Sequence, residues 1–513
     1  MSLTRRQFLW TTAASGIWLP AALRAQDDEP ALFKHGVASG DPLGDRVILW
    51  TRVTPPPTRS ATGPIAVDWQ IADDEQLTRV VARGAASAAP ERDFTVKVDA
   101  GGLRPGRTYF YGFTAGGQRS PVGRTRTLPA RGAARLQFAL VCCANYPAGY
   151  FNPYRCVADR ADLDAVIHVG DYIYEFDNGV YGDGTKLSRI PEPRHEAVSL
   201  ADYRIRYATY RTDPDLQAVH ARHPFIVVWD DHELANDAWI GGAVNHNPEQ
   251  GEGEWRVRRA AAYQAYREWL PIREAPGDDV HLYRTFHFGG LADLIMLDTR
   301  GLRDQQTAND NLVALADPSR TVLGKVQESW MFDELRSSHR AGTPWRILGQ
   351  QIMFAKLAFP NRPVPLVDTW EGYQGARARV LDFLAREKVG DVAILSGDIH
   401  SSWAFDVPQD PFGGYTARTG AGSLAVEFVA PAVSSPPIFA DSTLRDLVMP
   451  LQVLLPHLKY VEGESRGYVS LDVTPGRIQA DWYHVPGVLE RSDAERKAVG
   501  FVCERGSSHL TPA

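Results

Sequence analysis

The sequence predicts an α/β protein in which a small β-sandwich precedes a larger sandwich of mixed β-sheets flanked by helices. Residues 33–127 contain short β-branched and aromatic runs separated by Gly, Pro and Asp turns. Residues 136–513 instead alternate apolar runs with helical patterns. The chain has 513 residues, of which 44% are hydrophobic, so it is long enough to bury two unequal cores.

The first residues have the form of an export signal. Arg5 and Arg6 precede a short, weakly apolar stretch, "TTAASGIWLPAALRA", that ends in small residues near Ala25. This arrangement is typical of a twin-arginine signal, and the stretch is too short and too interrupted to span a bilayer. We therefore expect a signal peptide over residues 1–25, export by the twin-arginine machinery, and a periplasmic or secreted protein. Retention as a membrane anchor is the alternative.

Strand-like runs dominate the next part of the chain. They read "RVILWTRVT", "IAVDWQIA", "DFTVKVDAGGL" and "TYFYGFTAGG". Strands at this spacing, about seven in all, predict a small β-sandwich over residues 33–127. The stretch "TLPARGAARL" then changes the composition to Pro, Ala, Gly and Arg, and we expect it to link this domain to the one that begins near residue 136.

The larger domain contains a series of apolar runs that each end in polar residues. They are "LQFALVCC", "DAVIHVGD", "PFIVVWDDHE", "LADLIMLDTR", "WRILGQQIM" and "DVAILSGDIH". Helical patterns such as "ARARVLDFLAREK" lie between several of them. Apolar strands that alternate with helices predict mixed sheets covered by helices. The carboxyl ends of such strands are where functional sites form.

Charge and cysteine content exclude two classes of protein. The formal net charge of −7 is small for this length, and no basic block follows the first residues, so we expect no nucleic-acid partner. The cysteines, Cys142, Cys143, Cys156 and Cys503, are too few for a disulfide-built scaffold. One disulfide involving Cys156 is the pairing left open. We expect a monomer.

Several of the strand ends carry residues that can bind metal ions. In chain order, these are Cys142 or Cys143 with Asn145, then Asp171 and Tyr174, then Asp230, Asp231, His232 and Asn236, and finally Asp398 and His400. Carboxylates and imidazoles bind multivalent cations, and a carboxylate can bridge two of them. A phenol, whose ordinary pKa is near 10, binds a metal only when a strong Lewis acid removes its proton, so Tyr174 favours Fe(III).

Each of these residues also has a structural interpretation. An Asp that follows a strand is commonly a turn former or a helix cap. His168 and His232 can be core histidines, and a buried cysteine is by default a small hydrophobic residue. Unrelated turns would not all end apolar strands with Asp and include Asp-His or Asp-x-His pairs, so the combination favours a metal site.

The series "GVASGDP…VILWTRV", "VCCANYPAGYFNPY", "HVGDYIYE", "WDDHELAND" and "LSGDIHSSW", behind a twin-arginine signal, resembles the PhoD-like alkaline phosphatases. These are relatives of the purple acid phosphatases in the metallophosphoesterase superfamily. The resemblance spans roughly residue 33 to the C-terminus. It implies an Ig-like N-terminal domain, a metallophosphoesterase domain over residues 136–513 with a C-terminal capping segment, and a cluster of Fe(III) and Ca(II).

The resemblance also implies a role for individual residues. It assigns Cys143 and Tyr174 to iron, Asp171 as the carboxylate that bridges the metals, Asp231 and Asn236 to calcium, and Asp398 and His400 as the remaining ligands. His232 would face the phosphate and, with Asp171, carry the catalytic role. The family usually has Ser-Cys-Gln where this chain has Cys142, Cys143 and Ala144, and alignment on the following "NYPAGYF" favours Cys143.

The implied reaction is the hydrolysis of phosphate esters by a metal-activated water or hydroxide. The substrate would be a small-molecule or lipid phosphate ester. Two alternatives stay open: a phospholipase D-like phosphodiesterase acting on lipid headgroups, and a catalytically silent cell-surface binding protein that keeps the fold.

Overall fold

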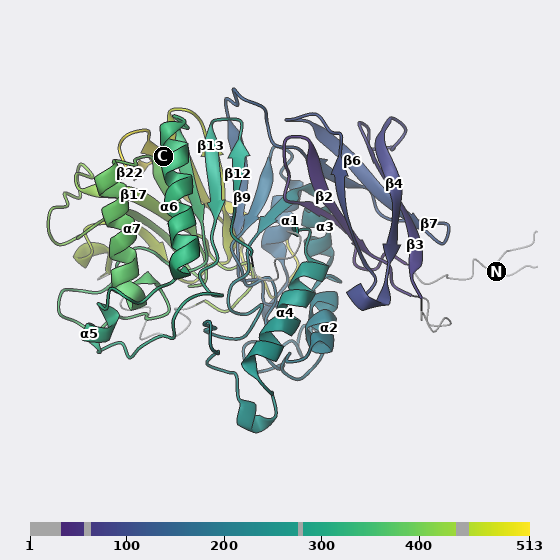
Figure 1. The fold of residues 1–513 in the computed structure, drawn as a ribbon, viewed down its shortest axis with the longest axis horizontal. Coiled ribbons are helices and arrows are strands. Elements are labelled where there is room, and N and C mark those ends of the chain that lie inside the picture. The colour runs from purple at the N-terminus through teal and green to yellow at the C-terminus, as the bar shows by residue number, and fades with distance from the viewer. Residues whose placement is uncertain (1–31, 56–62, 275–280, 438–450) are drawn as a thin grey trace, which may run out of the picture. The chain divides into compact units, whose positions relative to one another are not determined.

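Two mixed β-sheets pack face to face in the computed structural model, which describes residues 32–55, 63–274, 281–437 and 451–513 (Figure 1). In spatial order, the ten-stranded sheet consists of β22 (Leu510–Pro512), β21 (Arg496–Glu504), β20 (Arg477–His484), β19 (Gly467–Val473), β9 (Leu136–Val141), β10 (Ala165–His168), β11 (Pro224–Val227), β1 (Val37–Gly40), β2 (Arg46–Arg52) and β5 (Thr95–Gly101). The seven-stranded sheet consists of β12 (Arg284–Phe288), β13 (Ala292–Met296), β14 (Trp345–Gly349), β15 (Val392–Ser396), β17 (Ser423–Val429), β16 (Ser402–Pro408) and β18 (Leu458–Glu462).

Helices cover the outer faces of both sheets. They are α1 (Asn152–Asp159), α2 (Leu200–Tyr210), α3 (Pro214–Arg222), α4 (Trp255–Trp269), α5 (Leu312–Leu315), α6 (Gly324–Arg340) and α7 (Gln374–Glu387). Short 3₁₀ helices lie at η1 (Pro90–Arg92), η2 (Tyr146–Ala148), η3 (Pro248–Gln250) and η4 (Trp370–Tyr373). The predicted helix "ARARVLDFLAREK" is α7, and each apolar run predicted as a strand of the larger domain contains one of β9, β10, β11, β13, β14 and β15.

Alternating side chains of the strands enter different cores. Val166 of β10 packs in the core with α2 and α4, whereas its neighbour Ile167 packs against the second sheet. In that sheet, Leu294 faces the first sheet and Ile295 packs in the core with α6 and α7. Figure 1 shows α6 and α7 along the second sheet, away from α1 to α4. The predicted α/β sandwich of mixed sheets flanked by helices is confirmed.

The N-terminal strands lie in two sheets. β3 (Ile65–Ala72), β4 (Val80–Ala88), β6 (Thr108–Ala115), β7 (Gln118–Arg119) and β8 (Gly123–Arg126) form a separate five-stranded sheet. It shares a core with β2 and β5, which belong to the ten-stranded sheet through β1. There, Ser39 and Gly40 pair in parallel with Pro224 and Phe225 of β11. The two predicted domains are therefore joined by a continuous sheet as well as by the segment between β8 and β9. The Ig-like character of the first domain stays a prediction.

The C-terminal strands extend the ten-stranded sheet. β19 pairs with β9, and β20, β21 and β22 follow in antiparallel order. The predicted export signal lies outside the described residues. Within those residues, no helix is both long and apolar enough to cross a membrane.

The cysteines are unpaired. Cys142, Cys143, Cys156 and Cys503 are all buried and free. The disulfide left open for Cys156 is therefore absent, because its Sγ atom lies 3.6 Å from the carbonyl oxygen of Asp493 and near no other sulfur.

Candidate metal centre

Parallel strands bring the predicted ligands to one edge of the sandwich. β9, β10 and β11 are parallel neighbours in the first sheet, and β13, β14 and β15 are parallel neighbours in the second. Cys143 follows β9, Asp171 follows β10, Asp231 follows β11, and Asp398 and His400 follow β15. The carboxyl ends of parallel strands lie at the same edge, so residues far apart in the sequence meet there.

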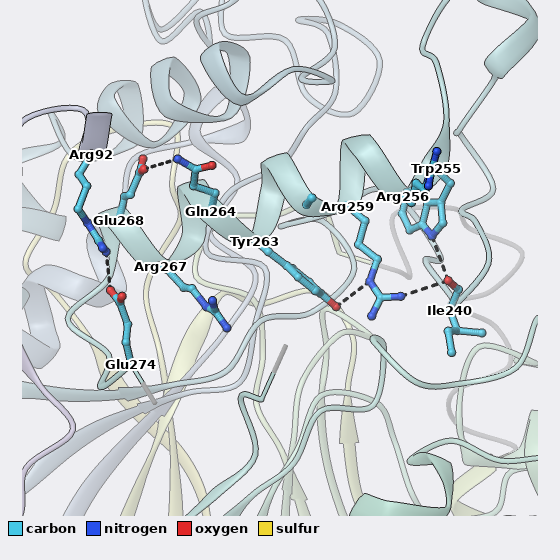
Figure 2. A pocket seen from close by; sticks show the side chains of 11 residues that line it. Arg92, Ile240, Trp255, Arg256, Arg259, Tyr263, Gln264, Arg267, Glu268 and Glu274 are labelled. Carbon is cyan, nitrogen blue, oxygen red and sulfur yellow. Dashed lines mark hydrogen bonds and ion pairs between the residues drawn. The ribbon is translucent and has the colours of Figure 1, made fainter. Parts of the chain in front are cut away.

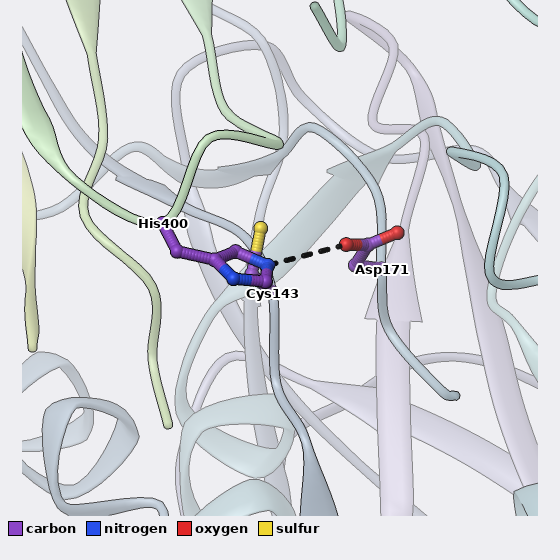
Figure 3. A group of neighbouring side chains, drawn as sticks. All are labelled: Cys143, Asp171 and His400. Carbon is purple, nitrogen blue, oxygen red and sulfur yellow. Dashed lines mark ion pairs between the residues drawn. The ribbon is translucent and has the colours of Figure 1, made fainter. Parts of the chain in front are cut away.

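Cys143, Asp171 and His400 form the first ligand group. Each offers one ligand atom, and these atoms lie within 4.8 Å of one another (Figure 3). Tyr174 joins them, because its Oη donates to Asp171 Oδ2 at 2.7 Å and lies 3.0 Å from His400 Nε2. Burial raises the pKa of both the Cys143 thiol and the Tyr174 phenol. Both groups therefore keep their protons unless a cation displaces them.

A second group surrounds the buried guanidinium of Arg300. Asp230, Asp231 and Asp398 offer ligand atoms within 4.8 Å of one another. Arg300 Nη2 donates to Asp398 Oδ1 at 2.6 Å and lies 3.4 Å from Asp231 Oδ1, while its Nε donates to Asp230. Its Nη1 donates to Asp368 at 2.5 Å. Arg300 thus sits among several carboxylates, and a second buried arginine, Arg303, has its Nη2 2.7 Å from Asp368 Oδ1.

The two groups are connected through Asp171, Asp231 and His232, which also offer ligand atoms within 4.8 Å of one another. His232 Nδ1 lies 2.8 Å from Glu175 Oε2. Burial alone would lower the pKa of His232, but the carboxylates of Asp231, Glu175 and Asp171 raise it well above the usual value. Asn236 lies at the same edge, and its backbone N–H donates to Glu175 Oε1 at 2.6 Å.

Unpaired oxygen atoms point to cations at this edge. Asp171 Oδ1, Asp230 Oδ2, Asp231 Oδ1 and the side-chain oxygen of Asn145 are buried without a hydrogen-bond partner. Buried polar atoms are normally paired, and an orphaned carboxylate oxygen is costly unless an ion or water meets it. Together with the thiol, phenol and imidazole, these oxygens fit a cluster of hard and borderline metal ions.

The backbone of the ligand residues is strained. Cys143, Asp171, Asp398 and His400 have φ values of 59°, 57°, 67° and 54°, in the left-handed region. Non-glycine residues pay about 1–3 kcal/mol for such conformations, which occur mostly at functional sites. The rest of the fold therefore holds these side chains in place at a cost to its own stability.

Glu233 fastens the loops beneath the ligands. Its carboxylate accepts hydrogen bonds from the backbone N–H groups of Asp171, Tyr172 and Asp230, at 3.0, 2.7 and 2.8 Å. Gly170 allows the close approach, since a Cβ atom there would lie 2.3 Å from Asp230 Cβ.

The ligand groups line a cleft of about 280 Å³. Its lining residues are Asp171, Phe176, Tyr181, Asp231, His232, Asn236, Asp237, Leu366, Asp368, Thr369, Asp398, Ile399 and His400. Within the part of the chain that the structure describes, no residue of the C-terminal segment "LERSDAERKAVGFVCERGSSHL" lines it, so the capping role of that segment stays a prediction. Ser434 and Ser435 of "VEFVAPAVSSPPIF" lie beside the centre, because Ser435 Oγ donates to Tyr174 Oη at 2.7 Å.

Cys142, the alternative to Cys143 as a ligand, has a structural role, and His168 is a core histidine as its structural interpretation predicted. Cys142 belongs to none of the ligand groups, and its Sγ lies 3.8 Å from the carbonyl oxygen of Ala430. It packs on Gly397, where a Cβ atom would lie 2.8 Å from the sulfur. His168 is fully buried, and its Nε2 lies 2.8 Å from Tyr154 Oη.

Sequence reasoning missed four residues of this edge: Glu175, Glu233, Arg300 and Asp368. Arg300 ends the run "LADLIMLDTR", so its place after a strand was a usable signal, but an arginine is no metal ligand. Asp368 lies in a loop, where no strand end or periodic pattern marks it.

A larger cavity of about 670 Å³ lies along α4, apart from the ligand groups (Figure 2). Its charged side chains bond mainly to one another or to the backbone. Arg92 donates to Glu274 at 2.6 Å, and Arg259 donates to Tyr263 Oη at 3.0 Å. This arrangement offers no ligand group for a metal.

An α/β sandwich that gathers these ligand groups at the carboxyl ends of its strands defines a metal-binding enzyme. Residues 138–482 match the family model of the PhoD-like phosphatase, and residues 19–129 match that of the PhoD-like phosphatase, N-terminal domain. Alkaline phosphatase D of Bacillus subtilis (strain 168) is 39% identical over 495 residues, covering 93% of this chain and 82% of the relative. A solved structure described as "Structure of PhoD" matches with a TM-score of 0.84 and 37% identity, covering 94% of this chain and 92% of that chain.

The chain belongs to the PhoD-like phosphatase family. It is a phosphoric ester hydrolase, as the resemblance implied.

Proposed function

We propose that the protein is an exported phosphatase that hydrolyses small-molecule phosphate esters at an Fe(III) and Ca(II) centre. The observation that carries this proposal is the ligand set: a thiol, a phenol and an imidazole meet Asp171 on one side, and carboxylates meet it on the other. A phenolate is a hard, anionic ligand that suits Fe(III), and thiolate and imidazole are common ligands of iron, whereas carboxylate and amide oxygens suit Ca(II).

The proposed ligands divide accordingly. Cys143, Tyr174 and His400 would hold iron, Asp231, Asn236 and Asp398 would hold calcium, and Asp171 would serve both ions. When bound, such cations neutralise phosphate oxygens and activate water for in-line displacement at phosphorus.

The chain's own groups complete the centre. His232 is held by Glu175, and the carboxylates of Asp231, Glu175 and Asp171 raise its pKa, which favours the cationic form of a ring that lines the cleft where a phosphoryl oxygen would bind. Arg300 neutralises the carboxylates of the calcium side without facing the cleft. The hydrogen bond to Glu175 and the ion pairs with Asp230 and Asp398 hold these two side chains in place before substrate arrives, which is what preorganised electrostatic catalysis requires.

Elemental analysis combined with a substrate panel tests this function. We expect about one iron and at least one calcium per chain, consistent with two ligand sets, and hydrolysis of chromogenic phosphomonoesters. A calcium chelator should remove activity before it removes iron. Stoichiometric zinc without iron would contradict the metal assignment. Preferential cleavage of lipid headgroup diesters would favour the phospholipase D-like alternative, and hydrolysis of no ester would favour a silent binding protein.

A phenolate and a thiolate on Fe(III) should give a visible charge-transfer band, and replacing Tyr174 by Phe should bleach this band and weaken iron retention. The ring lies in a packed aromatic environment, 4.2 Å between centroids from His232, so its packing is kept while the phenolate is lost. Absorption spectra and iron content of the purified variant provide the measurement. Tyr172→Phe is the matched control, because Tyr172 Oη bonds to His220 in the core. An unchanged band in Tyr174→Phe would show that the Tyr174 phenol is not an iron ligand.

We also propose export to the periplasm or the medium as a folded monomer. The support is the sequence pattern around Arg5 and Arg6, together with the buried ligand set, because export after folding suits an enzyme that must be loaded with metal first.

Changing Arg5 and Arg6 to Lys should leave a folded precursor in the cytoplasm, because the export machinery reads the pair as an address. Cell fractionation with immunodetection provides the measurement. Arg104→Lys with Arg107→Lys is a control pair far from the signal, and it should be exported normally. Normal export of the double variant at positions 5 and 6 would refute the twin-arginine interpretation.

A further inference from the structure

Tyr181 lines the cleft between the two histidines of the centre. Its ring stacks on His232, with 6.2 Å between centroids, and on His400, with 5.9 Å between centroids. Its hydroxyl oxygen lies 2.8 Å from His400 Nδ1. Tyr181 follows no strand end and belongs to no ligand pattern of the sequence, and it is not among the candidate metal ligands.

The turn that carries Tyr181 is held in place by other residues. The side-chain N–H of Asn145 donates to the carbonyl oxygen of Tyr181 at 2.6 Å. Gly179 N–H donates to the carbonyl oxygen of Gly182 at 2.9 Å, which closes the turn around Tyr181. Gly182 has a φ of 114°, a conformation that favours glycine. The position of the phenol is therefore set by the protein before any ligand binds.

The hydrogen bonds of His400 determine which way the Tyr181 proton points. His400 Nδ1 lies 3.0 Å from the carbonyl oxygen of Pro436. A carbonyl oxygen only accepts, so Nδ1 carries the proton and Nε2 keeps its lone pair for the ligand group. The Tyr181 oxygen, which also faces Nδ1, must then accept from it. Its own O–H has no other partner among the described residues.

The cleft needs such a donor. Its lining is rich in carboxylates, namely Asp171, Asp231, Asp237, Asp368 and Asp398, and an ionised carboxylate can only accept hydrogen bonds. A phosphate ester also brings only acceptor oxygens at its phosphoryl group. Besides cations, it can be bound only by the few N–H and O–H groups that face the cleft.

We propose that Tyr181 is a substrate-binding residue whose hydroxyl donates a hydrogen bond to an oxygen of the phosphoryl group in the cleft. The inference rests on the proposed function, because it takes a phosphate ester as the ligand. Inorganic phosphate carries the same acceptor oxygens and serves as the probe.

Tyr181→Phe tests the proposal in the metal-loaded enzyme. Loss of one hydrogen bond to a charged group should lower kcat/KM by about 10- to 100-fold and weaken inhibition by inorganic phosphate by a similar factor. Iron and calcium content and the visible band should stay at wild-type values. Tyr150→Phe is the control, because it removes a hydroxyl from a ring outside the cleft that contacts Arg189 and Arg491.

Two results would overturn the role of Tyr181. Unchanged kcat/KM and phosphate inhibition would show that the hydroxyl does not contact the phosphoryl group. If the variant lost activity in proportion to its loss of iron, Tyr181 would only position His400 and would not bind substrate. If the wild-type enzyme hydrolysed no ester, the proposed function would fail separately, and phosphate binding to wild-type and variant holoenzyme, measured by calorimetry, would still decide the role of Tyr181.

Discussion

Asp171→Asn is expected to lower turnover by roughly 10³-fold, because about 4 kcal/mol of metal-dependent transition-state stabilisation should be lost. The amide keeps the volume of the side chain but removes the negative charge that two ligand groups share. The fold should survive, because asparagine tolerates the left-handed φ of 57° at this position. Stability should stay within about 1 kcal/mol of the wild type.

Steady-state rates, metal content and urea unfolding of the purified variant provide the measurement. Asp93→Asn is the matched control, since Asp93 also has a left-handed φ, of 51°, but lies in the N-terminal sandwich. It should keep the wild-type rate. If Asp171→Asn kept both the rate and the metals, Asp171 would only end a strand, and the metal centre would lie elsewhere.

Arg300→Gln should destabilise the metal-free protein by about 3–5 kcal/mol, the usual cost of removing one partner from a buried ion pair. Its guanidinium is fully buried and contacts the carboxylates of Asp230, Asp231, Asp368 and Asp398. Without it, these carboxylates repel one another in a largely buried region, where their charges are poorly screened. Calcium should restore much of the loss, because a divalent cation can replace the missing positive charge.

Urea unfolding, measured once with a chelator and once with excess calcium, distinguishes the loss of the Arg300 charge from the loss of its packing. Arg377→Gln is the control, because Arg377 is also buried but donates to the backbone carbonyl oxygens of Phe354 and Pro408. Its destabilisation should not respond to calcium. An Arg300→Gln effect that calcium leaves unchanged would mean that Arg300 stabilises by packing alone and is no counter-charge for the centre.

Much of the larger domain could be predicted because its signals are local. An apolar run such as "DAVIHVGD" is hydrophobic on both strand faces, and in the structure Val166 and Ile167 enter two different cores. The same locality explains the ligands. Asp171 follows β10 and Asp398 follows β15, each a parallel strand of its own sheet, and the face-to-face packing of the two sheets brings both carboxylates to one edge.

The N-terminal strands show where local signals end. Alternating runs predicted a sandwich, but nothing in "GVASGDP" indicates that β1 pairs in parallel with β11, almost two hundred residues away along the chain. Strand pairing depends on which edges are free after the rest of the chain has folded. The choice between the two adjacent thiols also depends on the tertiary structure. The left-handed turn at Cys143 and the packing of Cys142 on Gly397 make the two side chains point in different directions.

By itself, the sequence determined the fold class, the strands and the candidate metal ligands that follow them, since periodicity and strand-end chemistry are properties of neighbouring residues. Only the tertiary structure decided what surrounds those ligands. Glu233, Arg300, Asp368 and Tyr181 come from separate loops, and their roles depend on distances across the cleft. Arg300 compensates the charge of buried carboxylates, and His400 orients the hydroxyl of Tyr181. In both cases the partners are remote in sequence, and only folding brings them together.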